Sequence, residues 1–265
     1  MRSVQRRPMP LSPEELRPLV EDFLEGLELW PALHGQADSV RYSITVGGKR
    51  VRPVICLATA EAVGADAERA LPAACALELV HTFSLVHDDL PALDDDEERR
   101  GQPSTWKQFG EATGILAGDA LLAEAFRLAT SYDTPHVARE LSQATLGMIG
   151  GQYLDITGTA PDEATLHKLK TGCLFEASVG LALWVADVTE TDQLPWRAFA
   201  SELGLLFQIV DDILDGDGYV VVHGVDGARR FADEAADRAR ARLVAIDADT
   251  SVLREIVDGL AVRTA

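Results

Sequence analysis

The chain has little of what would place it among several classes of protein. Its three cysteines, Cys56, Cys75 and Cys173, are an odd number without metal-ligand spacing, so we interpret them as small buried apolar residues. Lys plus Arg number 24 against 43 Asp plus Glu, a net charge of −19, which argues against a nucleic-acid or anionic-membrane partner. No apolar stretch has signal-peptide length, and none approaches the roughly 20 residues that span a bilayer. We therefore expect a cytoplasmic protein without a membrane span.

Linkers, low-complexity tracts and internal repeats are also missing, so we expect one domain over residues 1–265. Ser12, Pro13 and Glu15 predict an N-cap, a first helical residue and a capping box. Only 219–222 looks strand-like. Helical spacing of apolar residues recurs in further stretches: 51–63, 67–89, 111–130, 135–157, 162–187, 195–215 and 227–245. The pattern predicts an all-α bundle of long helices.

Five aspartates crowd into residues 88–96, directly after the apolar stretch 71–86. Pro91 cannot continue a helix, so Asp88 and Asp89 should lie in the last turn and Asp94 on the turn beyond, where the three can converge. Two carboxylates about 5 Å apart repel by roughly 3 kcal/mol at an effective dielectric near 20. Such a cluster is either fully solvated or neutralised by a cation, and carboxylates with room for water are what Mg²⁺ selects.

A second aspartate group, Asp211, Asp212 and Asp215, interrupts another apolar helix at 203–215. Asp211 and Asp215 are four residues apart and share a face. Carboxylates in so apolar a segment are costly without a cation. Two facing walls of this kind suggest a clamp of several magnesium ions for a diphosphate.

A basic counterpart lies at 47–53, where glycines lead into a helix that carries Lys49 and Arg52 on one face. This segment could hold a second diphosphate. Arg99 and Arg100 add planar guanidinium donors beside the first aspartate group, and that geometry matches phosphate oxygens.

These motifs resemble, in order and approximate spacing, those of the polyprenyl synthetase family, and look most like bacterial short-chain farnesyl or geranyl diphosphate synthases. The resemblance covers about residues 35–215. It implies the isoprenoid synthase fold, a helical bundle around a central cavity. Its segments are Gly47–Pro53, His81–Gly101, Phe109–Gly110 with Gly118–Leu122, Gly150–Gln152 with Asp155, Lys170–Gly172, and Phe207–Asp215.

The resemblance also implies roles for particular residues. About three Mg²⁺ ions would be held directly or through ligand waters by the metal-site residues Asp88, Asp94, Asp211 and Asp215, with further waters on Asp89 and Asp212. Isopentenyl diphosphate would be held by Lys49, Arg52, His81 and Arg100. The allylic diphosphate would meet Arg99 and Lys170, and the reacting carbons would face Thr171 and Gln208. Phe83 would wall off the tunnel for the growing tail, which favours C10 or C15 products, with C20 possible.

The family expectation is thus a Mg²⁺-dependent prenyltransferase acting on isoprenoid diphosphates, and a homodimer. One departure is that no lysine follows Lys170, although family members normally carry one in a loop after the second aspartate motif; Arg229 and Arg230 are the nearest cations. This departure keeps open a catalytically weak or inactive partner subunit. A terpene cyclase is a further alternative, but it would not need the basic site at Lys49, Arg52 and His81.

Overall fold

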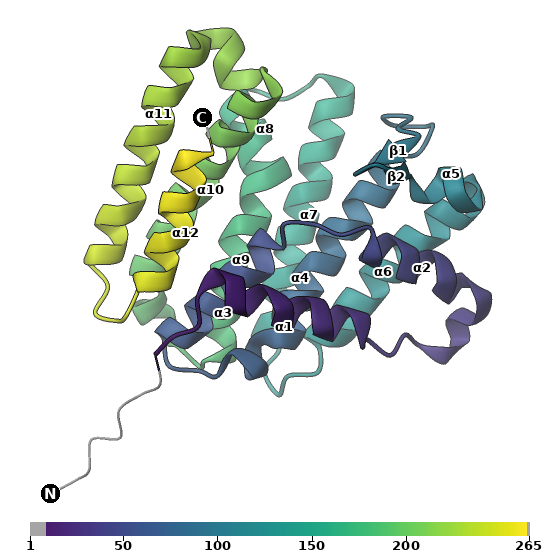
Figure 1. Ribbon diagram of the computed structural model, residues 1–265, viewed down its shortest axis with the longest axis horizontal. Coiled ribbons are helices and arrows are strands. Elements are labelled where there is room, and N and C mark those ends of the chain that lie inside the picture. Colours follow the sequence, from purple (N-terminus) through teal and green to yellow (C-terminus); the bar gives the residue numbers. More distant parts are fainter. Residues whose placement is uncertain (1–8, 264–265) are drawn as a thin grey trace, which may run out of the picture.

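The computed structural model describes residues 9–263, and Figure 1 shows a bundle of long helices with one small hairpin. One 3₁₀ helix (η1) and one π-helical turn (η2) join the α-helices. In chain order the elements are α1 Pro13–Glu25, η1 Pro31–Gln36, α2 Ala37–Thr45, α3 Val51–Ala62, α4 Ala67–Asp88, β1 Glu98–Arg99, β2 Gln102–Pro103, α5 Thr105–Phe109, α6 Glu111–Ala129, α7 His136–Thr157, α8 Glu163–His167, η2 Lys168–Gly172, α9 Cys173–Val185, α10 Glu190–Asp215, α11 Gly218–Val244 and α12 Ser251–Val262.

The all-α prediction is confirmed, and so is the start of α1. The Ser12 side chain accepts a hydrogen bond from the Glu15 amide while the Glu15 carboxylate accepts one from the Ser12 amide, at 3.3 and 2.9 Å. The predicted start of the 195–215 helix, at Pro195, was wrong. Helix α10 begins five residues earlier, at Glu190, because Thr189 supplies the N-cap. Sequence periodicity had not identified the short helix α2 or the C-terminal helix α12.

The strand expected at 219–222 is a helix, the first part of α11. The Val220 amide donates to the Asp217 carbonyl at 2.8 Å, and no neighbouring strand is available among residues 9–263 for this segment to pair with. A helix satisfies the backbone groups without a partner, so it outweighs the strand preference of three valines. Gly224, at φ 70°, then kinks α11 before its alanine-rich second part.

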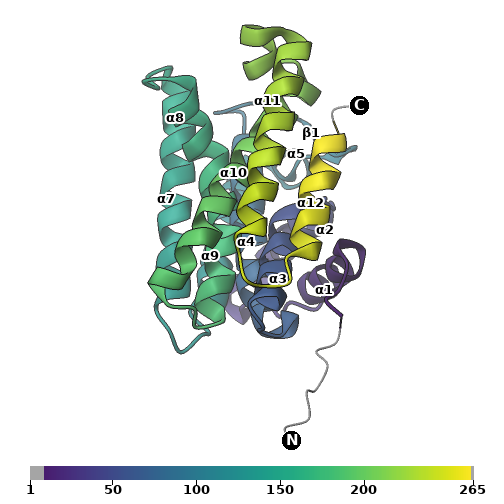
Figure 2. The same cartoon turned by 90° about the vertical axis from the view of Figure 1, so that its left-hand side faces the viewer.

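Helix α4 lies at the centre of the bundle. It packs against α3, α6 and α9, while α10 packs between α9 and α11. In Figures 1 and 2 the hairpin β1–β2, α8 and the start of α11 all lie toward one end of the molecule, and α4 and α10 both finish near that end. The topology therefore brings both aspartate groups to the same end of the bundle.

The sequence expectation that no segment has the length and hydropathy of a membrane span does not hold for α4. Among the described residues, α4 is long enough and apolar enough to span a membrane, judged by length and composition alone. However, 67% of the apolar window is buried against neighbouring helices, as befits the core helix of a bundle.

Gly151 sets the distance between α7 and the π-helical turn η2. A Cβ atom there would come within 2.7 Å of the Lys170 Cα, and closer still to the Lys170 amide nitrogen. These are backbone atoms that cannot rotate away, so only glycine allows this approach. A Cβ at the adjacent Gly150, by contrast, would meet no atom within 4 Å.

We predict that Gly151→Ala lowers the free energy of unfolding by roughly 1–3 kcal/mol, because the added methyl group forces η2 away from α7. Gly150→Ala is the matched control and should leave stability unchanged or raise it by about 0.5–1 kcal/mol. Chemical denaturation followed by circular dichroism measures both. Equal effects of the two substitutions would contradict a role for the close approach at Gly151.

Candidate active site

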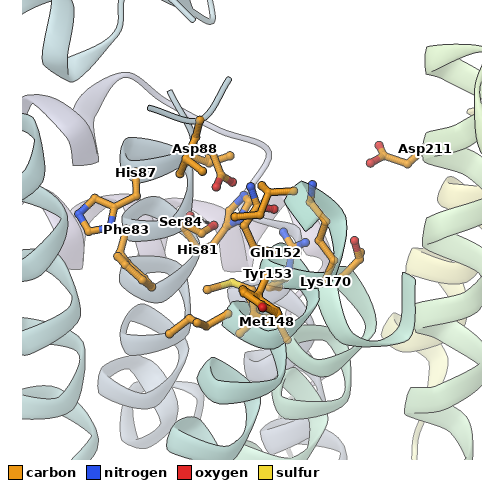
Figure 3. A pocket seen from close by; sticks show the side chains of 17 residues that line it. His81, Phe83, Ser84, His87, Asp88, Met148, Gln152, Tyr153, Lys170 and Asp211 are labelled. Atoms are coloured by element: carbon orange, nitrogen blue, oxygen red, sulfur yellow. Dashed lines mark hydrogen bonds between the residues drawn. The ribbon is translucent and has the colours of Figure 1, made fainter. Parts of the chain in front are cut away.

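A cavity of about 550 Å³ opens between α4, α7, α9 and α10. Figure 3 shows Asp88 and Asp211 on opposite sides of it, with Lys170 between them in this view. Most of its wall is apolar, formed by Phe83, Leu85, Leu93, Met148, Ile149, Ile156 and Leu174. The cavity therefore combines charged groups at its mouth with a water-poor interior.

The first aspartate group has the turn geometry that Pro91 predicts. Helix α4 ends at Asp88, Asp89 is its C-cap, and the Asp94 amide donates to the Asp88 carbonyl at 2.9 Å. Asp89 is buried and accepts a hydrogen bond from Arg99 Nε at 2.9 Å, with a second contact from the same guanidinium. Asp88 is half-buried on the cavity wall, and Asp94 is exposed.

Burial raises the pKa of Asp88 to about 6, against the opposing effect of Lys170, and the charges of Asp94 and Asp89 add to the rise. On the facing wall, burial and then the charge of Asp215 raise the pKa of Asp211, although Arg52 and Lys49 oppose them. Both pKa values are raised mainly because burial disfavours the charged form, and a cation bound between the two walls would favour it.

Lys170 and Thr171 both line the cavity from η2. The Lys170 ammonium pairs with the Asp155 carboxylate of α7, which accounts for the Asp155 position in the sequence motif. Gln208 does not line this cavity. Its Nε2 donates to Asp212 Oδ1 at 2.6 Å, and its side chain faces a separate pocket between α8, α9 and α10. Its expected place beside the reacting carbons is therefore not the one observed.

A second cavity, of about 560 Å³, adjoins the first and shares Arg52, His81, Leu85 and Asp211 with it. Five of the six residues expected to hold diphosphates line it, and the sixth, Lys170, lines the first cavity instead. The five are Lys49, Arg52, His81, Arg99 and Arg100. Gly48 leaves room for the Arg100 guanidinium, whose Nη1 would lie 2.7 Å from a Cβ at that position. The structure therefore brings together a basic cluster from α3, α4 and the hairpin.

The basic cluster is short of negative charge. Arg52 lies with its Cζ 4.6 Å from the centre of the Phe175 ring, and its buried Nε has no hydrogen-bond partner among the described residues. Burial lowers the pKa of Arg52 and of Arg100. Burial, and then the charges of Arg52 and Arg100, hold the pKa of His81 well below its usual range, so His81 is neutral. Such a cluster suits an anionic ligand.

Arg50 has the opposite character, and sequence reasoning assigned it no role. It is buried in the left-handed conformation, at φ 50°, and donates to Glu78 at 2.8 Å, to the Ile44 carbonyl at 2.8 Å and to Glu21 at 3.1 Å. This network holds the turn between Lys49 and Arg52. Glu78 is the lone acidic residue in the apolar stretch 71–86, and this is the sequence signal that could have predicted a buried cationic partner.

The carboxylates on the cavity wall fit a divalent cation. Within residues 9–263, no hydrogen bond or ion pair to the side chain of Asp88 or Asp211 is found, unlike Asp89. Gln152, quoted in a motif but given no role, adds a buried Oε1 without a partner on the same cavity wall. Oxygen donors that face a cavity and lack a protein cation match what Mg²⁺ prefers.

The fold and the site thus define an all-helical protein with adjoining acidic and basic cavities suited to diphosphates. The chain belongs to the polyprenyl synthetase family: the family model described as "Polyprenyl synthetase" matches residues 36–224. The farnesyl diphosphate synthase of Bacillus subtilis is 37% identical over 259 residues, which cover 85% of this chain and 88% of that protein.

A geranylgeranyl diphosphate synthase of Cyanophora paradoxa is 45% identical over 194 residues, which cover 67% of this chain and 64% of that protein. The chain thus spans less than two thirds of the length of this curated relative. Among solved structures, an FPP/GFPP synthase from Zymomonas mobilis superposes with a TM-score of 0.84 at 32% identity, over 94% of this chain and 97% of that one.

Proposed function

We propose that this chain is a Mg²⁺-dependent prenyltransferase that condenses isopentenyl diphosphate with dimethylallyl or geranyl diphosphate. The supporting observation is that two cavities adjoin, one with unpaired carboxylates at its mouth and one with unpaired cations, and share Arg52, His81 and Asp211. Two diphosphates held in these cavities would bring their hydrocarbon parts together. A terpene cyclase would not need the second, basic cavity.

The expected chemistry divides between the two cavities. Mg²⁺ held by Asp88, Asp94 and Asp211, with Asp215 beside them, would neutralise charge on the departing diphosphate. Lys170 and Arg99 would add charge-assisted hydrogen bonds to that group once they turn from Asp155 and Asp89. The allylic C–O bond breaks, and the homoallylic double bond supplies the electron pair of the new C–C bond. A C–H bond beside the resulting cation then breaks, its electrons form the new double bond, and the released diphosphate takes the proton.

The remaining residues position the partner and exclude water. Lys49, Arg52, Arg100 and neutral His81 would orient isopentenyl diphosphate in the basic cavity. Apolar side chains of α4, α7 and α9 keep water from the allylic cation. Thr171 lies on the cavity wall, where its hydroxyl can face the reacting carbons.

We predict that Asp88→Ala and Asp211→Ala each lower turnover by at least roughly 10²- to 10³-fold, because each removes a charge that acts on the leaving group through the metal. The measurement is product formation with Mg²⁺, isopentenyl diphosphate and geranyl diphosphate. Asp133→Ala, on an exposed turn, is the control and should keep full activity.

The circular dichroism spectrum should remain helical in all three variants, which would show that a loss of activity is not caused by unfolding. Near-normal turnover in Asp88→Ala or Asp211→Ala would overturn the proposed clamp. A wild-type chain that binds Mg²⁺ and diphosphate but turns over no allylic substrate would instead support the inactive partner subunit.

Product length is proposed to depend on Phe83. This buried side chain lines the cavity five residues before Asp88, about 7.5 Å along α4, and meets His87 edge-on with ring centroids 5.1 Å apart. Gly118 of α6 lets the His87 ring approach, because a Cβ at position 118 would overlap it. Phe83 therefore sits where a growing tail would meet a wall.

We predict mainly C15 product from wild type and a shift toward C20 and longer products from Phe83→Ala, since the smaller side chain opens the cavity floor. Chromatography of the dephosphorylated products measures the distribution. Phe126→Ala on α6 is the control, because Phe126 does not line the cavity. A wild type that makes mainly C20 or longer chains would remove Phe83 as the limiting wall.

In the lysine-free region after Asp215, the first backbone amides already have hydrogen-bond acceptors within the protein. The amides of Gly216 and Asp217 both donate to the Asp212 carbonyl, at 2.8 and 3.2 Å, so they are not spare donors for a diphosphate. Closure over the diphosphate by the amides of Gly216 and Asp217 is therefore not favoured, and we propose that Arg229 or Arg230 takes the place of the lysine. Both are exposed on α11.

We also propose a homodimer, supported by an apolar face of α6 and α7. Its exposed side chains are Ile115, Leu116, Leu146, Ile149, Tyr153 and Ile156. Three of them, Ile149, Tyr153 and Ile156, also line the cavity, so a second copy on this face would close its outer wall. A patch of this kind is typical of an interaction site.

Sedimentation analysis should give twice the 28.6 kDa of one chain. Leu116→Glu and Leu146→Glu should shift the chain toward monomer, because a charge would be buried at the interface. Leu194→Glu, equally exposed but on α10, is the control and should leave the mass unchanged. A monomeric wild type would overturn the proposal.

A cytoplasmic location also stays a proposal. It is supported by Cys56, Cys75 and Cys173, all free thiols, as a reducing compartment favours. Cell fractionation would test it.

A further inference from the structure

Three ligand-type side chains meet on the far side of the π-helical turn from Lys170. Glu163 and His167 come from α8 and Asp212 from α10, and one donor atom of each lies within 4.8 Å of the others. His167 Nε2 and Glu163 Oε1 are 3.4 Å apart. None of the three lines the cavity at Asp88. The resemblance implies a magnesium-bound water on Asp212, but this carboxylate meets Gln208, the Tyr219 amide and the cluster instead, so we treat the cluster as separate from the proposed magnesium site.

The cluster contains polar atoms that the protein leaves unpaired. His167 Nε2 is buried and has no hydrogen-bond partner among the described residues, and the same is true of Gln208 Oε1. Both side chains line the same pocket, of about 230 Å³. Buried polar atoms are normally paired, so two unpaired ones in one pocket indicate a missing partner.

Asp212 is already oriented as a ligand. This buried carboxylate accepts hydrogen bonds from Gln208 Nε2 at 2.6 Å and from the Tyr219 amide at 2.9 Å, one on each oxygen. A carboxylate has about four lone-pair positions, so each oxygen can still accept a further bond. Outer hydrogen bonds of this kind fix the direction of metal ligands.

We propose that Glu163, His167 and Asp212 bind a divalent transition-series cation such as Zn²⁺. An imidazole together with carboxylates suits Zn²⁺ or Co²⁺, whereas Mg²⁺ takes oxygen ligands. Two ligands at 2.0–2.2 Å from a tetrahedral Zn²⁺ lie roughly 3.4 Å apart, which is the separation of the His167 and Glu163 donors. Water or Gln208 Oε1 supplies the fourth ligand.

The cation would tie α8 to α10. Because α8 continues directly into η2, it would connect the turn that carries Lys170 and Thr171 to the helix that carries Asp211. The site is therefore a structural link between the two walls of the cavity, and its occupancy should raise thermal stability.

Visible absorption of Co²⁺ tests the site on the full chain, stripped of metal by a chelator. Excess Mg²⁺ is present throughout to occupy all-oxygen sites. We expect the chain to bind one equivalent of Co²⁺, with an absorption spectrum that reports imidazole ligation. Added Zn²⁺ should displace the bound Co²⁺. His167→Gln and Glu163→Gln should each weaken binding at least about 10-fold. His34→Gln, at an exposed position of the 3₁₀ helix η1, is the control and should bind like wild type.

Thermal unfolding gives a second readout that does not depend on enzyme activity. Zn²⁺ should raise the Tm of wild type and His34→Gln, and leave that of His167→Gln unchanged. Because Glu163 is exposed at the start of a short helix, Glu163→Gln stays informative even if His167→Gln is unstable. Equal Co²⁺ affinity in wild type and Glu163→Gln, or a wild type that binds no Co²⁺, would overturn the proposal.

Discussion

Charge that the protein leaves unmatched is the constraint on which the site depends. Asp88, Asp211 and Arg52 are withdrawn from water, and the opposite charges near them form no ion pair with them among the described residues. Each such group lowers stability, because burial disfavours the charged form. The apolar packing of α3, α4 and α9 has to offset this loss. The same imbalance creates affinity for cations at one cavity and for anions at the other.

Paired charges have a different role, which is to hold the unpaired ones in place. Arg50 with Glu78 secures the turn between Lys49 and Arg52. Asp89 with Arg99 secures the start of the hairpin beside Asp88 as long as no diphosphate draws the Arg99 guanidinium away. A paired ion is fixed in direction by its hydrogen bonds, whereas an unpaired ion keeps its donors or acceptors for a ligand. Neighbouring residues of one motif thus have different roles: Asp89 is paired and holds the local structure, whereas Asp88 is unpaired and faces the cavity.

Backbone packing decides how near the charged walls come to each other. Gly151 lets η2 approach α7, and this places Lys170 at the mouth of the cavity and beside Asp155. On the opposite side of η2, Asp212 meets His167. The π-helical turn therefore lies between two polar clusters: it carries Lys170 of the first, and His167 of the second directly precedes it on α8. π-Helical turns of this kind are frequent at functional sites.

Local physics determined what the sequence alone could establish. The period of apolar residues predicts most of the long helices, and Pro91 predicts the end of α4, because both depend on neighbours in the chain. The resemblance to a family predicted that Lys49, Arg52, His81 and Arg100 act together and put Arg99 with Lys170, whereas in the structure Arg99 lines the same cavity as the first four. Only the tertiary structure decided that 219–222 is helical, that Gln208 faces away from the cavity and that Arg50 is buried against Glu78. These outcomes depend on which helices pack together and on the hydrogen-bond partners that packing supplies, and neither is encoded in local periodicity.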